Sequence, residues 1–322
     1  MVHSRAVTMP GVVSLDDVRD AAERIRGYVV RTPLERSLGL SEHCGVDVWL
    51  KFECFQATGA FKLRGALNAL LTLEADKVVT ASAGNHGLGV ARAASLLGVS
   101  AVVVIPETAS EAKVEALRHS GAELVQCGPT YDEAEAEGLR LARERGLPFI
   151  SAYNDPAVIA GGGTIALEIL EDAPHLDTIV VPAGGGGLIG GIGVAAHGLR
   201  PDVTVIGVQS VASPALHAAL QAGAIVPVEV KPSLADGLSG NVEESTITLG
   251  LLQEHVREVA LVEEAEIAEA MRWLVVHERV VVEGSAAVSV AALLNRRLDV
   301  PGPVAVVLTG RNVSAAVLQH YV

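Results

Sequence analysis

Short apolar runs alternate along the chain with longer segments in which apolar positions recur at helical spacing. The apolar runs are almost continuous and rich in Val and Ile, which is typical of parallel strands covered on both faces. They predict strands at Lys77–Ala81, Ala101–Ile105, Ala122–Gln126, Thr178–Pro182, Val203–Val208 and Val304–Thr309. The other segments predict helices at Leu15–Arg26, Phe61–Leu71, Asn85–Leu97, Glu111–His119, Tyr131–Arg145, Val158–Leu170, Leu188–Gly198 and Glu264–Val280.

This alternation of strands and helices predicts an α/β protein in which helices flank parallel sheets. The segment from Lys77 to Phe149 holds a compact series of strands and helices of its own. We therefore expect a large domain formed by residues 1–73 and 150–322. A small domain, residues 74–149, is inserted in it.

Composition narrows the class of protein. Of the 322 residues, 50% are hydrophobic, which excludes intrinsic disorder. Lys and Arg number 24 and Asp and Glu 38, so the net charge is −14. This acidic balance disfavours a nucleic-acid or anionic-membrane partner, because such a partner needs a basic face.

The sequence also bears on compartment. Cys44, Cys54 and Cys127 are widely separated and form no CxxC pair, which favours reduced thiols in a cytoplasmic protein over a zinc or disulfide framework. The N-terminus lacks the apolar core of a signal peptide. The uncharged stretch from Thr178 to Ala196 contains Pro182 and many glycines, so we interpret it as a strand, a loop and a helix start.

Lys62 is the first candidate for chemistry. It lies in Gly59-Ala60-Phe61-Lys62-Leu63-Arg64-Gly65, at the predicted start of a helix. The positive end of a helix dipole disfavours the ammonium form, and a lysine with a lowered pKa is what Schiff-base chemistry needs. A solvated surface lysine is the alternative interpretation.

Two further loops follow predicted strands. In Ser82-Ala83-Gly84-Asn85-His86-Gly87, free N–H groups at a helix start could bind a carboxylate, although an ordinary turn would look the same. In Gly184-Gly185-Gly186-Gly187, followed by Leu188, the backbone can approach a phosphate closely. Gly185, Gly187 and Gly190 also match a dinucleotide-binding pattern. The next strand ends in Gln209-Ser210 without the acidic residue that holds a ribose, which disfavours a nicotinamide dehydrogenase.

Together these three motifs, in this order, resemble the serine/threonine dehydratase group of fold-type-II enzymes that depend on pyridoxal 5'-phosphate (PLP). The resemblance extends from Thr32-Pro33-Leu34 to Thr309-Gly310-Arg311-Asn312. It implies a fold of two open-sheet domains like that of the tryptophan synthase β subunit. The short motifs Ser239-Gly240-Asn241 and Gly310-Arg311-Asn312 further resemble dehydratases assigned to hydroxyectoine breakdown.

The resemblance implies a role for each motif. Lys62 would carry PLP and act as the catalytic base, Phe61 would pack against the ring, and Asn85 would bond its 3-hydroxyl oxygen. Thr309 would face the pyridine nitrogen. The phosphate would rest on Gly184, Gly185, Gly186, Gly187 and Leu188, and the substrate carboxylate on Ser82, Ala83, Gly84, Asn85 and His86.

The reaction that the resemblance implies is conversion of a β-hydroxy amino acid such as L-threonine or L-serine to a 2-oxo acid and ammonia. It also implies a homodimer or homotetramer. Serine racemases of the group place a second acid/base serine where this chain has Ala83, which favours dehydration over racemisation. Residues 209–215 carry no carboxylate, so we expect no metal there. Arg311 either reaches a substrate group or pairs with an acid such as Glu283, and His86 either contacts the cofactor or satisfies a backbone carbonyl.

Overall fold

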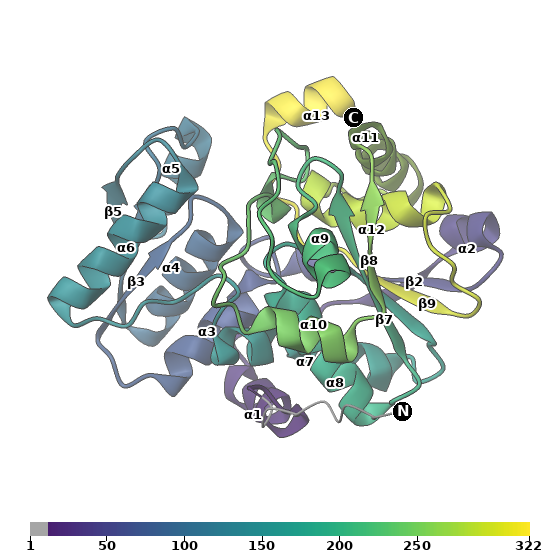
Figure 1. Ribbon diagram of the computed structural model, residues 1–322, viewed down its shortest axis with the longest axis horizontal. Helices are drawn as coiled ribbons and strands as arrows, with labels where there is room; N and C mark the ends of the chain where they lie inside the picture. Colours follow the sequence, from purple (N-terminus) through teal and green to yellow (C-terminus); the bar gives the residue numbers. More distant parts are fainter. Residues whose placement is uncertain (1–11) are drawn as a thin grey trace.

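The computed structural model describes residues 12–322, in which the strands form two separate sheets (Figure 1). The larger sheet has the order β1-β2-β9-β6-β7-β8, and all its pairs are parallel except β1 with β2. The smaller is the parallel sheet β3-β4-β5. The strands span Leu34–Ser37 (β1), Val48–Lys51 (β2), Lys77–Ala81 (β3), Ser100–Ile105 (β4), Glu123–Gln126 (β5), Thr178–Pro182 (β6), Thr204–Ser210 (β7), Glu258–Val262 (β8) and Val304–Val307 (β9).

Helices cover both faces of the large sheet, as Figure 1 shows, while α4 to α6 accompany the small one. The helices span Leu15–Ile25 (α1), Leu38–Cys44 (α2), Lys62–Thr72 (α3), Asn85–Leu97 (α4), Glu111–Arg118 (α5), Tyr131–Arg145 (α6), Pro156–Asp172 (α7), Gly187–Leu199 (α8), Ala215–Ala222 (α9), Thr248–His255 (α10), Glu264–Trp273 (α11), Gly284–Leu294 (α12) and Ala315–Tyr321 (α13). Short 3-10 turns cover Glu53–Phe55 (η1) and Asp236–Leu238 (η2), and a π-helical turn covers Leu274–Glu278 (η3).

Strand β9 shows why its sequence is a continuous apolar run. Ala305 and Val307 pack into the core formed with α1, α7 and α8, whereas Val304 and Val306 pack into the core formed with α11 and α12. Successive side chains of a strand point to opposite faces, so a strand buried on both faces needs apolar residues at every position.

The predicted strands and helices are all present, with ends shifted by a few residues. The segment Glu264–Val280 is interrupted, because α11 ends at Trp273 and a π-helical turn follows. The sequence did not predict β1, β2 or β8. The first two have only four residues each, and β1 is charged and exposed at its centre. Helix α12 was also missed, because ten of its eleven residues are buried and no amphipathic pattern remains.

All strands of the small sheet lie between Lys77 and Gln126. This separation supports the division into a large domain and an inserted small one, and the boundaries at residues 74 and 149 stay a prediction. The two parts touch through polar side chains: Lys113 of α5 bonds Asp236 of η2 at 2.9 Å. The start of α4 also reaches the large domain, because Asn85 bonds Glu283, the residue before α12, at 2.7 Å.

Neighbouring helices approach closely at glycines. A Cβ at Gly161 of α7 would lie 2.7 Å from the Arg64 carbonyl oxygen of α3, whereas one at Gly162 would meet Leu188 at an ordinary 3.5 Å. We expect Gly161→Ala to lower the free energy of unfolding by about 1–3 kcal/mol, because two backbones must separate. Gly162→Ala is expected to be neutral or slightly stabilising. Denaturant unfolding of the two variants measures the difference, and equal losses would contradict this packing.

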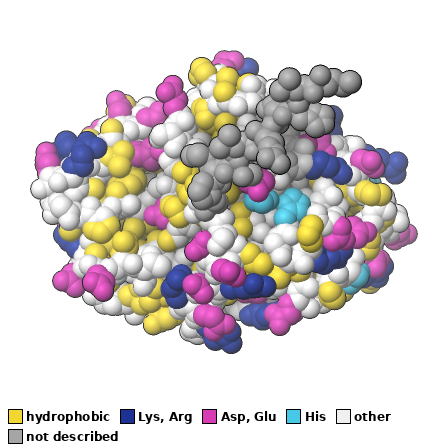
Figure 2. All heavy atoms as spheres, turned by 60° about the horizontal axis from the view of Figure 1, so that its bottom comes forward, with side chains coloured by type: hydrophobic (Ala, Val, Ile, Leu, Met, Phe, Trp, Pro, Cys, Tyr) yellow, Lys and Arg dark blue, Asp and Glu magenta, His cyan; other side chains and the backbone are white. Residues whose placement is uncertain are grey.

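The molecular surface mixes charges of both signs. On the face drawn in Figure 2, Lys and Arg side chains are interspersed with Asp and Glu and form no continuous basic patch. Within residues 12–322, no helix has the length and apolar character to cross a membrane.

Candidate active site

Lys62 is the first residue of α3, and its amine turns toward the loop that precedes α7. Its Nζ donates a hydrogen bond to the Ala152 carbonyl oxygen at 2.8 Å and lies 5.1 Å from the centre of the Phe61 ring. Burial lowers the pKa of this amine to about 8, against the opposing effect of the Glu283 carboxylate. Lys62 is half-buried and its amine bonds a backbone carbonyl, so the surface-lysine alternative is wrong. A pKa of about 8 leaves part of this amine uncharged near neutral pH.

The loop Ser82–His86 joins β3 to α4. Its first four residues are half-buried, and Gly84 precedes α4 without any side-chain cap, so the first N–H groups of the helix are free. A Cβ at Gly87 would lie 2.2 Å from the Ser82 carbonyl oxygen, so only glycine permits this turn. The geometry is that of an anion-binding helix start.

The tetraglycine segment joins β6 to α8. No side chain of the described residues caps α8, and Gly186 adopts a φ of 93°, which favours glycine. A Cβ at Gly185 would lie 2.4 Å from the Tyr153 ring, and one at Gly187 would lie 2.9 Å from the Tyr153 backbone. The predicted phosphate loop is thus an uncapped helix start whose backbone is in direct contact with the residue after Ala152.

Asn85 is held between two side chains from the part of the chain that forms the large sheet. Its Nδ2 donates to Glu283 Oε1 at 2.7 Å, and its Oδ1 accepts from Asn312 Nδ2 at 2.7 Å. The Asn312 backbone N–H donates to Glu283 Oε2 at 3.1 Å. Burial raises the pKa of Glu283 to about 7, with Asp236 adding to the effect. The second Nδ2 hydrogen of Asn85 remains for a ligand.

Thr309 and Phe61 meet at the end of β9. Thr309 is buried, and its carbonyl oxygen accepts a hydrogen bond from the Phe61 N–H at 3.0 Å. Arg311 does not pair with Glu283, so that alternative is wrong. Its guanidinium lies over the Phe55 ring at 5.5 Å, while Glu283 is occupied by Asn85 and Asn312. The Asn85 side-chain amide and the Asn312 backbone N–H donate to the Glu283 carboxylate instead of Arg311.

His86 lies at the end of the Ser82–His86 loop and is 3% exposed. Its Nε2 bonds the Ile150 carbonyl oxygen at 3.1 Å, which is the second of the two alternatives. Burial, followed by the Lys62 charge, lowers the pKa of the imidazole to about 3, so it is neutral. Because Nε2 must then carry the proton, Nδ1 is a buried acceptor without a partner among the described residues.

Tyr153 was not predicted as a site residue. It lies between a short loop and α7, in no motif, yet it contacts two glycines of the phosphate loop. A run of glycines indicates that another group packs closely against the backbone there. It does not indicate which residue that group belongs to, so the sequence could not identify Tyr153. Asn312 and Glu283 were noted in the sequence, but their contacts with Asn85 depend on how α4 meets α12.

The depressed pKa of Lys62 predicts a pH-dependent effect on stability. Folding lowers this pKa from its usual 10.5 to about 8. As pH falls from 10.5, the unfolded chain binds a proton at this amine before the folded protein does, so the free energy of unfolding decreases. The decrease is complete below pH 8. Without any ligand, Lys62→Met is expected to raise the melting temperature at about pH 7, with a gain that shrinks between pH 8 and 10.5. Calorimetry across this pH range tests it; a gain independent of pH would contradict the shift.

The site thus combines an amine with a lowered pKa and two uncapped helix starts, on a predominantly parallel α/β scaffold. These features define an enzyme that binds a phosphate-bearing cofactor and uses a lysine amine as nucleophile or base.

The chain belongs to the family of pyridoxal-phosphate-dependent enzymes, whose sequence model matches residues 25–310. It is 42% identical over 316 residues to L-threonine ammonia-lyase from Thermotoga maritima, covering 97% of this chain and 78% of that protein. Maize serine racemase superposes with a TM-score of 0.91 at 32% identity, covering 96% of each chain. A threonine deaminase from T.th. superposes with a TM-score of 0.88 at 37% identity, covering 94% of this chain and 99% of that one. The predicted fold class and the cofactor are thereby confirmed.

The residues present fit PLP. A phosphate needs N–H donors and close backbone approach, and the start of α8 offers both without a competing side-chain cap. Lys62 offers the amine that an aldehyde requires. The unpartnered Nδ1 of buried His86 marks a further polar atom close to this amine.

Proposed function

We propose that the protein is an ammonia-lyase that converts L-threonine or L-serine to the corresponding 2-oxo acid and ammonia. The observation that carries the proposal is the Lys62 amine, held at the Ala152 carbonyl between two uncapped helix starts and shifted to a pKa of about 8. The L-threonine ammonia-lyase and threonine deaminase among the relatives support this choice of substrate.

We propose a role in cofactor binding for each predicted residue. Lys62 carries PLP, Phe61 packs against its ring, and the remaining Nδ2 hydrogen of Asn85 bonds its 3-hydroxyl oxygen. The Thr309 hydroxyl faces the pyridine nitrogen. The phosphate rests on the N–H groups of Gly184, Gly185, Gly186, Gly187 and Leu188. When bound, PLP withdraws the electron pair that remains at the α-carbon after proton removal.

The chain's own groups then act on the amino acid. The loop Ser82–His86 binds the α-carboxylate at the start of α4, which orients the α-hydrogen toward Lys62. The amine of Lys62 takes that proton as general base, since its lowered pKa keeps it partly uncharged near neutral pH. The β-hydroxyl takes up one proton and leaves as water, and the proton that Lys62 has removed balances this loss. Hydrolysis of the carbon–nitrogen bond then consumes one water and gives the 2-oxo acid and ammonia.

The reaction is tested by supplying a panel of 3-hydroxy amino acids and measuring ammonia and 2-oxo acid together. We expect equimolar ammonia and 2-oxo acid from L-threonine or L-serine. Turnover of neither, with efficient turnover of another 3-hydroxy amino acid, would support the narrower resemblance to the hydroxyectoine-breakdown dehydratases instead. Release of no 2-oxo acid from any member would contradict the proposal.

Racemisation is the second candidate, because maize serine racemase has a similar structure. Ala83 has no group that could deliver a proton to the opposite face of the α-carbon. We expect D-serine formation to be a minor reaction, and Ala83→Ser to raise it at least about 10-fold, with Ala83→Gly as control. Chiral chromatography of the products measures both forms. Comparable D-serine and pyruvate from the unaltered protein would contradict this assignment.

We also infer a homodimer or homotetramer in the cytoplasm. The inference of compartment is supported by three free cysteines, Cys44, Cys54 and Cys127. Light scattering after gel filtration tests the assembly.

A further inference from the structure

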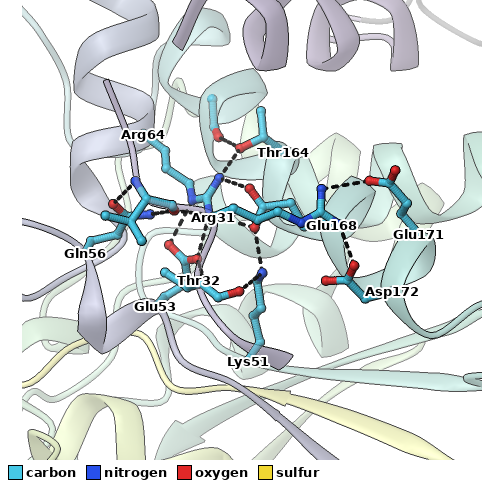
Figure 3. Close-up of polar contacts among 12 residues, drawn as sticks. Arg31, Thr32, Lys51, Glu53, Gln56, Arg64, Thr164, Glu168, Glu171 and Asp172 are labelled. Carbon is cyan, nitrogen blue, oxygen red and sulfur yellow. Dashed lines mark hydrogen bonds and ion pairs between the residues drawn. The ribbon is translucent and has the colours of Figure 1, made fainter. Parts of the chain in front are cut away.

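A cluster of charged side chains from α3, β2, η1 and α7 is buried around Arg64 (Figure 3). Lys51 and Glu53 are fully buried, and Arg64 is 1% exposed. The side chain of Glu168 is 14% exposed. Two cations and two carboxylates therefore face one another with almost no access to water. This burial is costly unless the groups hold each other in a well-defined geometry.

Arg64 is at the centre of the cluster. Its Nε and Nη2 donate to the two oxygens of Glu53 at 2.9 and 2.8 Å. Its Nη1 and Nη2 donate to the two oxygens of Glu168 at 2.7 and 3.0 Å, and Nη1 also reaches Thr164 Oγ1 at 3.2 Å. The planar guanidinium thus grips two carboxylates at once, which a lysine ammonium cannot reproduce.

The carboxylates belong to separate elements. Glu53 begins η1, just after β2, and Glu168 lies in α7. Lys51, at the end of β2, donates to Glu168 at 2.6 Å and to the Thr32 carbonyl oxygen at 2.7 Å. Arg64 therefore ties α3 to both the large sheet and α7.

The start of α3 needs such an anchor. Helix α3 begins at Lys62 with no side-chain cap, so its first turn is not fixed from within. Arg64 is two residues further on, about 200° around the helix axis, and so points away from the Lys62 side chain. Two contacts therefore fix the start of α3. The Phe61 N–H bonds the Thr309 carbonyl oxygen, and Arg64, on the opposite side of the helix, bonds Glu53.

Stability alone does not account for the cluster. Replacing buried ion pairs by apolar residues is often neutral or stabilising, so the cluster is weak evidence for stability, and its fixed geometry suggests a role in positioning. We propose that Arg64 is a positioning residue: through Glu53 and Glu168 it fixes the first turn of α3, and hence the point from which the Lys62 amine reaches the site. The part that concerns turnover rests on the proposed function.

Arg64→Lys tests the proposal, because it keeps the charge and loses the two-carboxylate grip. We expect kcat to fall about 10- to 100-fold with KM for the amino acid changed less than about threefold, since misplacement by about 1 Å has effects of this size. In protein freed of cofactor, acetylation of Lys62 followed by peptide mass spectrometry gives the pKa of its amine. We expect this pKa to shift from the unaltered protein's value.

The control is Leu293→Ala. Leu293 is a buried residue of α12 in the core formed with α11, to which no α3 residue belongs, so the substitution should lower stability without changing α3. If Arg64→Lys lowers the melting temperature but matches Leu293→Ala in kcat and in Lys62 labelling, Arg64 is only structural and the proposal is overturned. Should Arg64→Lys not fold, Thr164→Val removes one Arg64 contact, and about a two- to fivefold loss of kcat with a shifted Lys62 pKa is expected. No change in either quantity overturns the proposal.

Failure of this proposal is distinguishable from failure of the proposed function. The labelling of Lys62 needs neither substrate nor cofactor. If the unaltered protein releases no 2-oxo acid, the proposed function fails, while a shift in Lys62 labelling still supports the role of Arg64. If the unaltered protein and Arg64→Lys turn over equally, only the role of Arg64 fails.

Discussion

Replacement of Lys62 by alanine is expected to reduce 2-oxo acid release from L-threonine or L-serine by at least about 10³-fold. The variant loses both the amine that carries the cofactor and the base that removes the α-proton. Its fold should persist, because among the described residues this amine makes only one hydrogen bond, to the Ala152 carbonyl oxygen. Steady-state assays of ammonia and 2-oxo acid at saturating cofactor measure the loss.

Two additions sharpen this experiment. Lys231→Ala removes an exposed lysine whose side chain pairs with exposed Glu229, and it should retain full activity. Added methylamine should restore part of the activity of Lys62→Ala, since a small amine can enter the space that the side chain leaves. Turnover by Lys62→Ala within about tenfold of the unaltered protein would exclude Lys62 as the essential base.

Replacement of Gly185 by alanine is expected to weaken PLP binding about 10- to 100-fold. The new Cβ would lie 2.4 Å from the Tyr153 ring, so the phosphate loop or Tyr153 must move. Tyr153 is held at both ends, by its backbone against Gly187 and by its hydroxyl, which accepts from the Glu243 N–H at 3.3 Å. Displacing such a packed contact costs about 1–3 kcal/mol.

Absorbance titration of the cofactor-free protein with PLP measures that affinity. Gly250→Ala is the matched control, because Gly250 lies in neighbouring α10 with open space where its Cβ would be. Its affinity for PLP should equal that of the unaltered protein. Equal affinity of Gly185→Ala would mean that the tetraglycine segment does not hold the phosphate.

Much of this site could be predicted from local sequence because its parts are helix starts. Lys62, Asn85 and Gly187 each begin a helix immediately after a loop, and glycine patterns and strand-to-helix turns are local signals. The loop after β3 belongs to the small sheet and the loop after β6 to the large one, so their meeting depends on how the two sheets are placed and not on strand order.

The remaining contacts depend on tertiary packing, which no local pattern encodes. Tyr153 supports the phosphate loop through close approach of α7 and α8, and Glu283 reaches Asn85 only because α4 and α12 meet there. The alternative in which Arg311 pairs with Glu283 was wrong for the same reason. The sequence contains both charges, but it does not show that Asn85 and Asn312 donate to this carboxylate instead. The four-residue strands β1 and β2 lack enough length to show a pattern.

The central claim is that the Lys62 amine carries the cofactor. Borohydride reduction of the protein loaded with PLP, followed by digestion and mass spectrometry, locates the attached group directly. We predict one phosphopyridoxyl group per chain, on the peptide that contains Lys62. Attachment to another lysine, such as Lys51 or Lys113, or no attachment at all, would contradict the account.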